Sequence, residues 1–167
     1  MTVASTITDR KIDGGLEGLA RRLSEGITVS VGIQGNEASQ ASGKRGTTLA
    51  DLAAIHEYGL GGLPVRSWLR GWYDERETAI RAMIRTGYQK VIAGTVTAEV
   101  LAEGLGVHMV QEIQTRWTRP GAFQENAPST IKAKGSSAPL IDTGRLRSAV
   151  TYIVNAGKRA LAGGVSP

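Results

Sequence analysis

The chain has no cysteine among its 167 residues, which excludes disulfide bonds and metal sites built from thiolates. Aromatic residues are scarce at 5%, whereas glycine occurs 22 times, so we expect a modest core and long, mobile loops. No apolar run approaches the roughly 18 residues that a membrane helix needs. The N-terminus also lacks the charged and apolar regions of a secretory signal. We therefore expect a protein that folds in a reducing cytoplasm and has no membrane partner.

The size and charge of the chain predict one basic domain. With 41% hydrophobic residues it can bury a core of its own, so we expect a single domain over residues 1–155 and a flexible tail over 156–167. The formal net charge is +5, and residues 121–167 hold six Lys and Arg against two Asp and Glu. Such a segment can attract nucleic acid or an acidic protein. Charge alone favours a solvated basic loop over a binding surface. No aromatic side chains interleave with the basic residues to stack on bases.

Two strands and two long helices are predicted from periodicity. Residues Ile27–Ile33 alternate apolar and small polar side chains, and Ser148–Val154 is rich in β-prone residues, so both segments are expected to be strands. Apolar residues recur at steps of three and four over Val65–Ile92 and again over Thr97–Trp117, which predicts helices. The expected fold class is α+β, with a small antiparallel or mixed sheet packed against the two long helices.

Shorter helices are predicted by caps and spacing. Leucines repeat on one face of residues 14–25, and Thr47–Tyr58 begins with a variant capping box formed by Thr48 and Asp51. Gly59 is a natural stop for the second of these helices.

The segments between these elements read as loops. Residues 35–46 and 123–138 are rich in small and polar residues, and the second is long enough to suggest a function in an assembly. Residues 142–147 are expected to form a short helical turn before the last strand.

The usual catalytic signatures are not found. His56 and His108 lie in predicted helices without zinc-helix spacing, so hydrogen-bonded histidines at the edge of the core are favoured over a general base or a metal ligand. Residues 43–45, Gly-Lys-Arg, lack the serine or threonine and the first glycine of a phosphate-binding loop. We therefore predict no enzyme activity, no cofactor and no metal. A solvated charged face explains the acidic cluster of Asp74, Glu75 and Glu77.

Two tryptophans lie one helical turn apart, at 68 and 72, each beside an arginine. Tryptophan and arginine dominate the energetic centres of protein interfaces. Packing in the core is the alternative, and it is favoured for at least one of the two. These observations leave both roles open.

Five segments, taken in order, resemble one protein family. They are Val31-Gly32-Ile33, Ala53–Gly59, Pro64–Arg70, Ser129–Gly135 and Pro139–Tyr152. Together they resemble the virion-morphogenesis or tail-completion proteins of tailed bacteriophages, which act at the neck in head–tail joining. No single segment decides this, but the ordered set is fairly specific. The resemblance covers about residues 27–155.

The resemblance implies a structural role in the virion. It implies a homo-oligomeric ring, six- or twelve-fold, that completes the tail and contacts adjacent neck and tail proteins while genomic DNA passes through the lumen. Rings of this kind close through head-to-tail contacts. The chain departs from the family pattern at Trp68, where relatives usually have phenylalanine preceded by proline, and this difference touches packing rather than function.

The same resemblance yields two sets of expected contact residues. The candidates for a subunit interface are Arg66, Trp68, Arg70 and Trp72. The candidates for contact with a neighbour or with DNA are Lys132, Lys134, Arg145 and Arg147.

Two other classes of function remain open from the sequence. One is a basic protein that binds nucleic acid without regard to sequence, for which the basic C-terminal quarter is the motive. The other is an enzyme that acts on a polymer such as the cell wall. The lack of a paired-carboxylate or histidine–metal pattern argues against the enzyme.

Overall fold

We describe the protein from a computed structural model. The described residues are 26–42, 46–135, 137, 139–140 and 144–156. The helix predicted at residues 14–25 and most of the expected tail lie outside these residues, as do Asp142 and Thr143.

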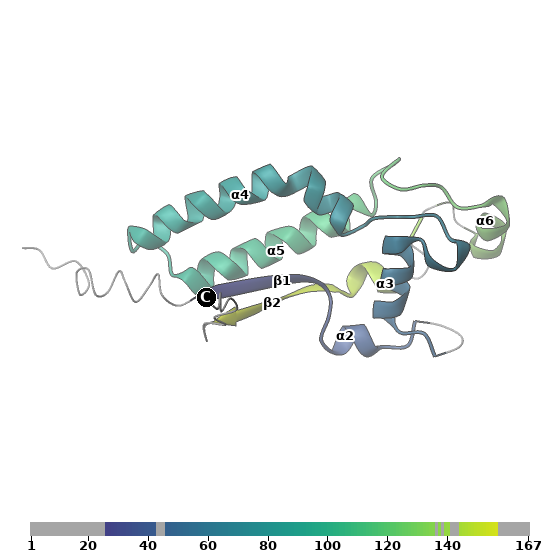
Figure 1. The fold of residues 1–167 in the computed structure, drawn as a ribbon, viewed down its shortest axis with the longest axis horizontal. Helices are drawn as coiled ribbons and strands as arrows, with labels where there is room; N and C mark the ends of the chain where they lie inside the picture. Colours follow the sequence, from purple (N-terminus) through teal and green to yellow (C-terminus); the bar gives the residue numbers. More distant parts are fainter. Residues whose placement is uncertain (1–25, 43–45, 136, 138, 141–143, 157–167) are drawn as a thin grey trace, which may run out of the picture.

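A two-stranded sheet and two long helices form the body of the described chain (Figure 1). Strand β1 (Ile27–Ile33) pairs antiparallel with β2 (Val150–Ala156). Helix α5 (Ala98–Arg116) contacts both strands, and α4 (Arg70–Ile92) packs on α5. The predicted α+β class, with a small antiparallel sheet and two long helices, is confirmed.

The sheet buries one face against α5 because its pairing aligns the apolar positions. Val31 lies opposite Tyr152 and Ile33 lies opposite Val150, so alternate residues of both strands share one face. Val150 is 3% exposed, and Val31 and Ile33 pack against the core. The strand predicted at Ile27–Ile33 has the predicted bounds.

The first long helix begins five residues later than its periodicity predicts. Residues 65–69, between Pro64 and α4, are not helical, and two of their side chains bond to distant parts of the chain, Trp68 to Ala53 and Arg66 to Gln124. Helix α5 begins where predicted, since Thr97 is its N-cap and accepts a hydrogen bond from the Val100 amide at 3.3 Å. The remaining helices of the described chain are α2 (Asn36–Ser39), α3 (Leu49–Tyr58), η1 (Leu60–Gly62), α6 (Pro128–Lys134) and α7 (Arg145–Ser148).

Helix α3 is fixed at both ends as the sequence predicts. The Thr48 side chain accepts from the Asp51 amide at 3.1 Å, and the Asp51 carboxylate accepts from the Thr48 amide at 2.9 Å, which completes the capping box. Gly59 ends the helix in the left-handed region with φ of 69°. An added Cβ at Gly59 would lie 2.7 Å from Val65 Cγ2, so glycine is required there for space as well as conformation.

Both predicted loops contain a short helix. Helix α2 occupies four residues of the 35–46 loop, and α6 occupies seven residues of the 123–138 segment. Helix α6 starts with Pro128 at its first turn and ends at Gly135, which has φ of 68°. Proline at the start of a helix and glycine at its end are a common arrangement. The composition of this segment nevertheless led us to predict a loop.

Two glycines let neighbouring elements approach closely. A side chain on Gly106 of α5 would collide with the ring of Tyr152 on β2, and one on Gly87 of α4 would collide with Leu101 of α5. Gly104, by contrast, faces open space. Of these two glycines of α5, only Gly106 is therefore required for a close approach, and the approach is to a strand.

Candidate functional site

Three of the four residues expected at a subunit interface lie inside the protein. Trp68 and Trp72 are each 3% exposed and Arg66 is 5% exposed, whereas the Arg70 side chain is 59% exposed. The sequence left open whether the two tryptophans pack in the core, and the structure shows that both do. Contact with a neighbouring subunit stays a prediction for all four residues, and only Arg70 has an exposed side chain that could make it directly.

Trp68 is held in the core by packing and by one hydrogen bond. Its indole Nε1 donates to the Ala53 carbonyl of α3 at 3.0 Å. Its ring meets Trp117 edge to face, with centroids 5.3 Å apart and planes at 80°. Replacing Trp68 should thus unfold the protein before it reports on any interface.

Arg66 fastens the segment that follows α5. Its guanidinium donates to the Gln124 carbonyl at 2.9 Å, to the Glu125 carbonyl at 3.2 Å and to Asn126 Oδ1 at 3.0 Å. These acceptors are about 60 residues away along the chain. Arg66 therefore orders part of the long segment that sequence reasoning treated as a mobile loop.

Glu57 joins α3 to the start of α4, and sequence reasoning missed this role. The residue is 5% exposed, and its carboxylate accepts from Ser67 Oγ at 2.7 Å and from the Leu69 amide at 2.9 Å. It also accepts from the amide and the Nε of Arg70 at 3.2 and 3.0 Å. Helix α4 has no side-chain cap of its own at Leu69, so Glu57 supplies the missing acceptor.

The sequence did contain a signal for this cap. The helix predicted over Val65–Ile92 has no serine, threonine, aspartate or asparagine directly before it, since Pro64 stands there. A helix without its own cap needs an acceptor from elsewhere, and an acidic residue lay in the preceding segment. Burial acts to raise the pKa of Glu57, but the hydrogen bonds from Leu69, Ser67 and Arg70 outweigh it and hold this pKa below its usual value.

Glu75 lies on the exposed charged face that the sequence predicted, with 43% of its side chain exposed, but it is also paired over a long range. Its carboxylate accepts from Arg116 at 2.8 Å and from Arg119 at 2.8 Å, and these bonds lower its pKa to about 2. Arg116 also donates to the Ser67 carbonyl at 2.7 Å. This network ties the end of α5 to the start of α4. Glu77 fits the prediction, since it pairs with Arg81 on the exposed helix face at 2.7 Å.

The four basic candidates of the C-terminal quarter do not behave alike. Lys132 is exposed on α6. Arg145 is exposed and donates to the Ala41 carbonyl at 3.0 Å, and the half-buried Arg147 donates to the Gln114 carbonyl at 2.9 Å. Lys134 ends α6. The structure thus uses two of these arginines to hold α7 to other parts of the chain, and contact with DNA or a neighbour stays a prediction.

The histidines sit in the predicted helices. His56 is half-buried in α3, and His108 of α5 lies 3.6 Å from the Glu112 carboxylate, which makes an ion pair when the histidine is protonated. Over the described residues there is no group of three or more histidines and carboxylates placed to hold a metal ion.

An exposed apolar ridge follows α3. It consists of Tyr58, Leu60, Leu63 and Val65, which are 55%, 50%, 43% and 57% exposed. Three glycines with positive φ, at 59, 61 and 62, fold this stretch into a tight turn. The Arg66 amide donates to the His56 carbonyl at 2.8 Å and closes the base of the turn. The ridge is therefore formed by one tight turn and the residues that flank it.

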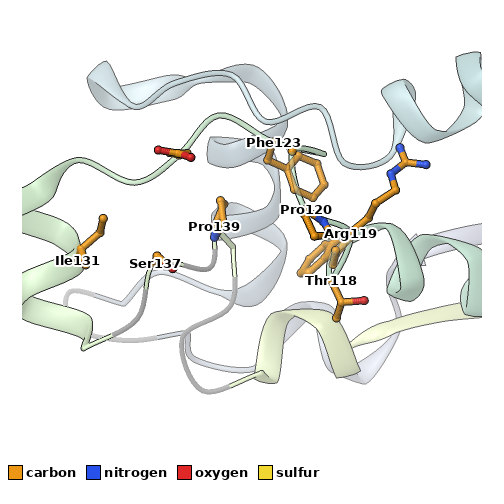
Figure 2. A pocket seen from close by; sticks show the side chains of 10 residues that line it. Thr118, Arg119, Pro120, Phe123, Ile131, Ser137 and Pro139 are labelled. Atoms are coloured by element: carbon orange, nitrogen blue, oxygen red, sulfur yellow. The ribbon is translucent and has the colours of Figure 1, made fainter.

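A hollow of about 490 Å³ lies beside the end of α5. Figure 2 shows Ile131, Ser137 and Pro139 on one side of it and Thr118, Pro120 and Phe123 on the other. Trp117 also lines it, and the indole Nε1 of this residue is buried with no acceptor among the described residues. We refer to it as the Trp117 hollow. Half of its ten lining residues are aromatic, aliphatic or proline, and the others include the charged residues Arg119 and Glu125.

No protein-family model matches the chain, and no curated protein or solved structure matches it. Among the described helices, none is long and apolar enough to cross a membrane.

Proposed function

We propose that the protein is a structural component of a tailed-phage virion. In this proposal it forms a ring at the neck or the top of the tail, completes the tail and joins it to the head. The proposal starts from the ordered sequence segments that resemble the tail-completion family. The observation that carries it further is how these segments interlock in the fold.

Two of the resembling segments form one scaffold. Glu57 in Ala53–Gly59 caps the helix that follows Pro64–Arg70, and Trp68 of the second segment donates to the Ala53 carbonyl of the first. The resemblance is therefore carried by residues that build the fold together, as expected of a motif that specifies a scaffold for assembly.

The last resembling segment joins the same body. Leu146 and Val150 of Pro139–Tyr152 are 5% and 3% exposed and belong to the core cluster that also contains Trp68. Arg147 fastens this segment to α5. These described parts of the resembling segments thus belong to one scaffold, whose outer surface is left for partners.

The test is electron microscopy of a lysate from a phage that lacks this gene. The proposal predicts full heads and finished-length tails that are separate, and joined particles when the gene is supplied from a plasmid. Joined particles of normal appearance in the deletion lysate would refute the head–tail role.

A basic protein that binds nucleic acid without sequence preference is the second candidate. It is favoured by Lys132 and Arg147, which form no ion pair among the described residues and so keep their charge available. Binding of the purified protein to duplex DNA at several salt concentrations tests it. A steep loss of affinity between about 50 and 200 mM salt is expected for several phosphate contacts, and no binding at the lowest salt would exclude it.

A further inference from the structure

A second cavity, of about 330 Å³, lies between the two long helices. Helices α4 and α5 run side by side (Figure 1), and the cavity is lined by the first turns of α4 and the last turns of α5. Apart from Trp72, every described residue that lines it is polar or charged. We refer to it as the interhelical cavity. Its chemistry therefore differs from that of the Trp117 hollow, half of whose lining is apolar.

Positive charge exceeds negative charge in the lining of the interhelical cavity. Three arginines and two glutamates line it, so its formal charge is +1 with His108 neutral. The ion pairs do not remove this excess, because each carboxylate is shared between two cationic side chains. The pairs are Glu75 with Arg116 and Arg119, each at 2.8 Å, and Glu112 with Arg76 at 2.6 Å and with His108 at 3.6 Å. The lining can therefore attract one further negative group.

Two buried donors at this cavity have no acceptor among the described residues. They are Trp72 Nε1 and Arg116 Nε, on residues that line the cavity and are 3% and 9% exposed. Folded proteins give nearly all buried N–H groups an acceptor, because a buried donor without one costs free energy. Arg76 and Arg119 add to this surplus, since a guanidinium carries five N–H groups and each of these two meets one carboxylate among the described residues. The cavity thus has donors in excess of acceptors.

We propose that the interhelical cavity binds a small oxyanion, a carboxylate or a phosphate. An oxyanion supplies several acceptor oxygens and a negative charge, which are the two things that the lining lacks. The planar guanidinium of arginine matches both kinds of oxyanion, and its hydrogen bonds to them are strengthened by charge. The oxyanion accepts from Trp72 and Arg116 and pairs with Arg76 and Arg119, whose side chains are 49% and 54% exposed. The inference does not depend on the proposed function, because the site is measured on the purified protein.

The indole N–H signals of the tryptophans provide the test. The chain has three tryptophans, and each has a different setting. Trp68 Nε1 donates to the Ala53 carbonyl, Trp72 lines the interhelical cavity, and Trp117 lines the separate hollow. The three signals of the isotope-labelled full chain are assigned by triple-resonance NMR. They are then followed during titration with sodium phosphate and, in a second series, with sodium malonate, with sodium chloride added to keep the ionic strength constant.

We expect the Trp72 signal to move and saturate with at least one of the two oxyanions, while the Trp68 signal stays in place. Saturation with phosphate alone identifies a phosphate site, and saturation with malonate alone identifies a carboxylate site. A Trp72 signal that moves no further than in chloride alone overturns the proposal. A shift confined to Trp117 also overturns it, because the oxyanion would then bind at the other hollow.

Charge variants of α4 test whether the arginines of the cavity hold the ligand. Arg76→Gln removes a cation from the lining and should weaken binding about tenfold, as expected for the loss of one hydrogen bond from a charged group. The matched control is Arg81→Gln, since Arg81 is also an exposed arginine of α4 paired with a glutamate but is not among the described residues that line the cavity. It should change the affinity less than about twofold, because salt screens exposed charges. Equal losses in the two variants would mean that the oxyanion responds to net charge alone, which contradicts a defined site.

Folding and function are separated from binding by further checks. Circular dichroism should give similar unfolding midpoints for both variants and the wild type, because the replaced side chains are at least half exposed. Arg119→Gln should weaken binding to a similar extent, and it decides the question if Arg76→Gln disturbs the fold. A failed titration leaves the head–tail role standing, since the gene deletion tests that role by itself. Normal joined particles in the deletion lysate, together with a saturating Trp72 signal, would leave the oxyanion site standing and the proposed function wrong.

Discussion

The replacement Glu57→Gln tests whether one buried carboxylate holds α4 to α3. Glutamine keeps the shape of the side chain, but one of the two oxygens becomes an amide nitrogen that donates rather than accepts. Glu57 accepts from donors on both oxygens, since the Leu69 amide binds one and Ser67 Oγ binds the other. Whichever way the amide is turned, at least one buried donor at the start of α4 loses its acceptor.

The magnitude follows from the bonds that are lost. A hydrogen bond to a charged group contributes about 1.5–3 kcal/mol, and a negative charge at a helix N-terminus contributes about 0.3–1 kcal/mol. We expect Glu57→Gln to lower the free energy of unfolding by about 2–3 kcal/mol on these values. Glu57→Ala removes every acceptor and should cost about 3–5 kcal/mol, as when a buried charged partner is removed.

Urea unfolding followed by tryptophan fluorescence is a suitable assay, because all three tryptophans are buried, at 2–3% exposed. The control is Glu77→Gln, which removes an exposed ion pair with Arg81 on α4 and should cost only about 0.3–0.5 kcal/mol. If Glu57→Gln is no more destabilising than this control, the carboxylate does not cap α4 and the reasoning is refuted.

The pH dependence gives an independent check on the same residue. The pKa of Glu57 is lowered in the fold from its usual value of 4.5, so its stabilisation is fully present above pH 4.5. It is lost as the pH falls from there through the lowered pKa, because the carboxylate must then take up a proton. The wild type should therefore lose more stability than Glu57→Gln between neutral pH and acid. A constant difference between the two at all pH values would contradict this.

Three further predictions concern other parts of the fold. The pKa of about 2 for Glu75 implies that its stabilisation of the fold is present above pH 4.5 and is lost toward pH 2. Glu75→Gln should reduce the acid-sensitive part of the free energy of unfolding by about 1 kcal/mol, a value that allows for the exposure of the side chain. Acid titration of the unfolding midpoint measures this change. Gly106→Ala should destabilise by about 1–3 kcal/mol because the new methyl group meets the Tyr152 ring. Gly104→Ala, on the same helix, should stabilise by up to about 1 kcal/mol, and equal effects of the two in urea would count against the packing described. Trp68→Ala should cost about 3–5 kcal/mol, and a folded variant of wild-type stability would remove Trp68 from the core.

The sequence was most informative where local rules act alone. Residues Ile27–Ile33 alternate so regularly that the strand could be given its exact bounds, and the capping box at Thr48 marked the start of α3. Pairing of the two strands was not readable, because it joins residues more than 100 positions apart. The expected class nevertheless followed from counting the elements, since two strands and two long helices leave few ways to bury their apolar faces.

The sequence was least informative about side chains whose partners are distant. Tryptophan and arginine at 68 and 66 suit an interface as well as a core, and only the positions of Ala53 and Gln124 show that both are used internally. The acidic residue at 75 is exposed as predicted, but its pairing with Arg116 could not be foreseen, because the two residues lie 41 positions apart. Composition predicts exposure for arginine, whereas Arg66 is buried because its hydrogen-bond acceptors lie in a distant part of the chain.

The segments that carry the family resemblance contain both buried and exposed residues. Glu57, Trp68 and Leu146 are each at most 5% exposed, so they specify how the chain folds. Tyr58 and Val65 lie in the same segments and are 55% and 57% exposed. A protein that assembles can keep its scaffold while its contacts change, since exposed residues are not bound by the packing of the core. We therefore expect the buried positions of these segments to report on folding and the exposed positions to report on partners.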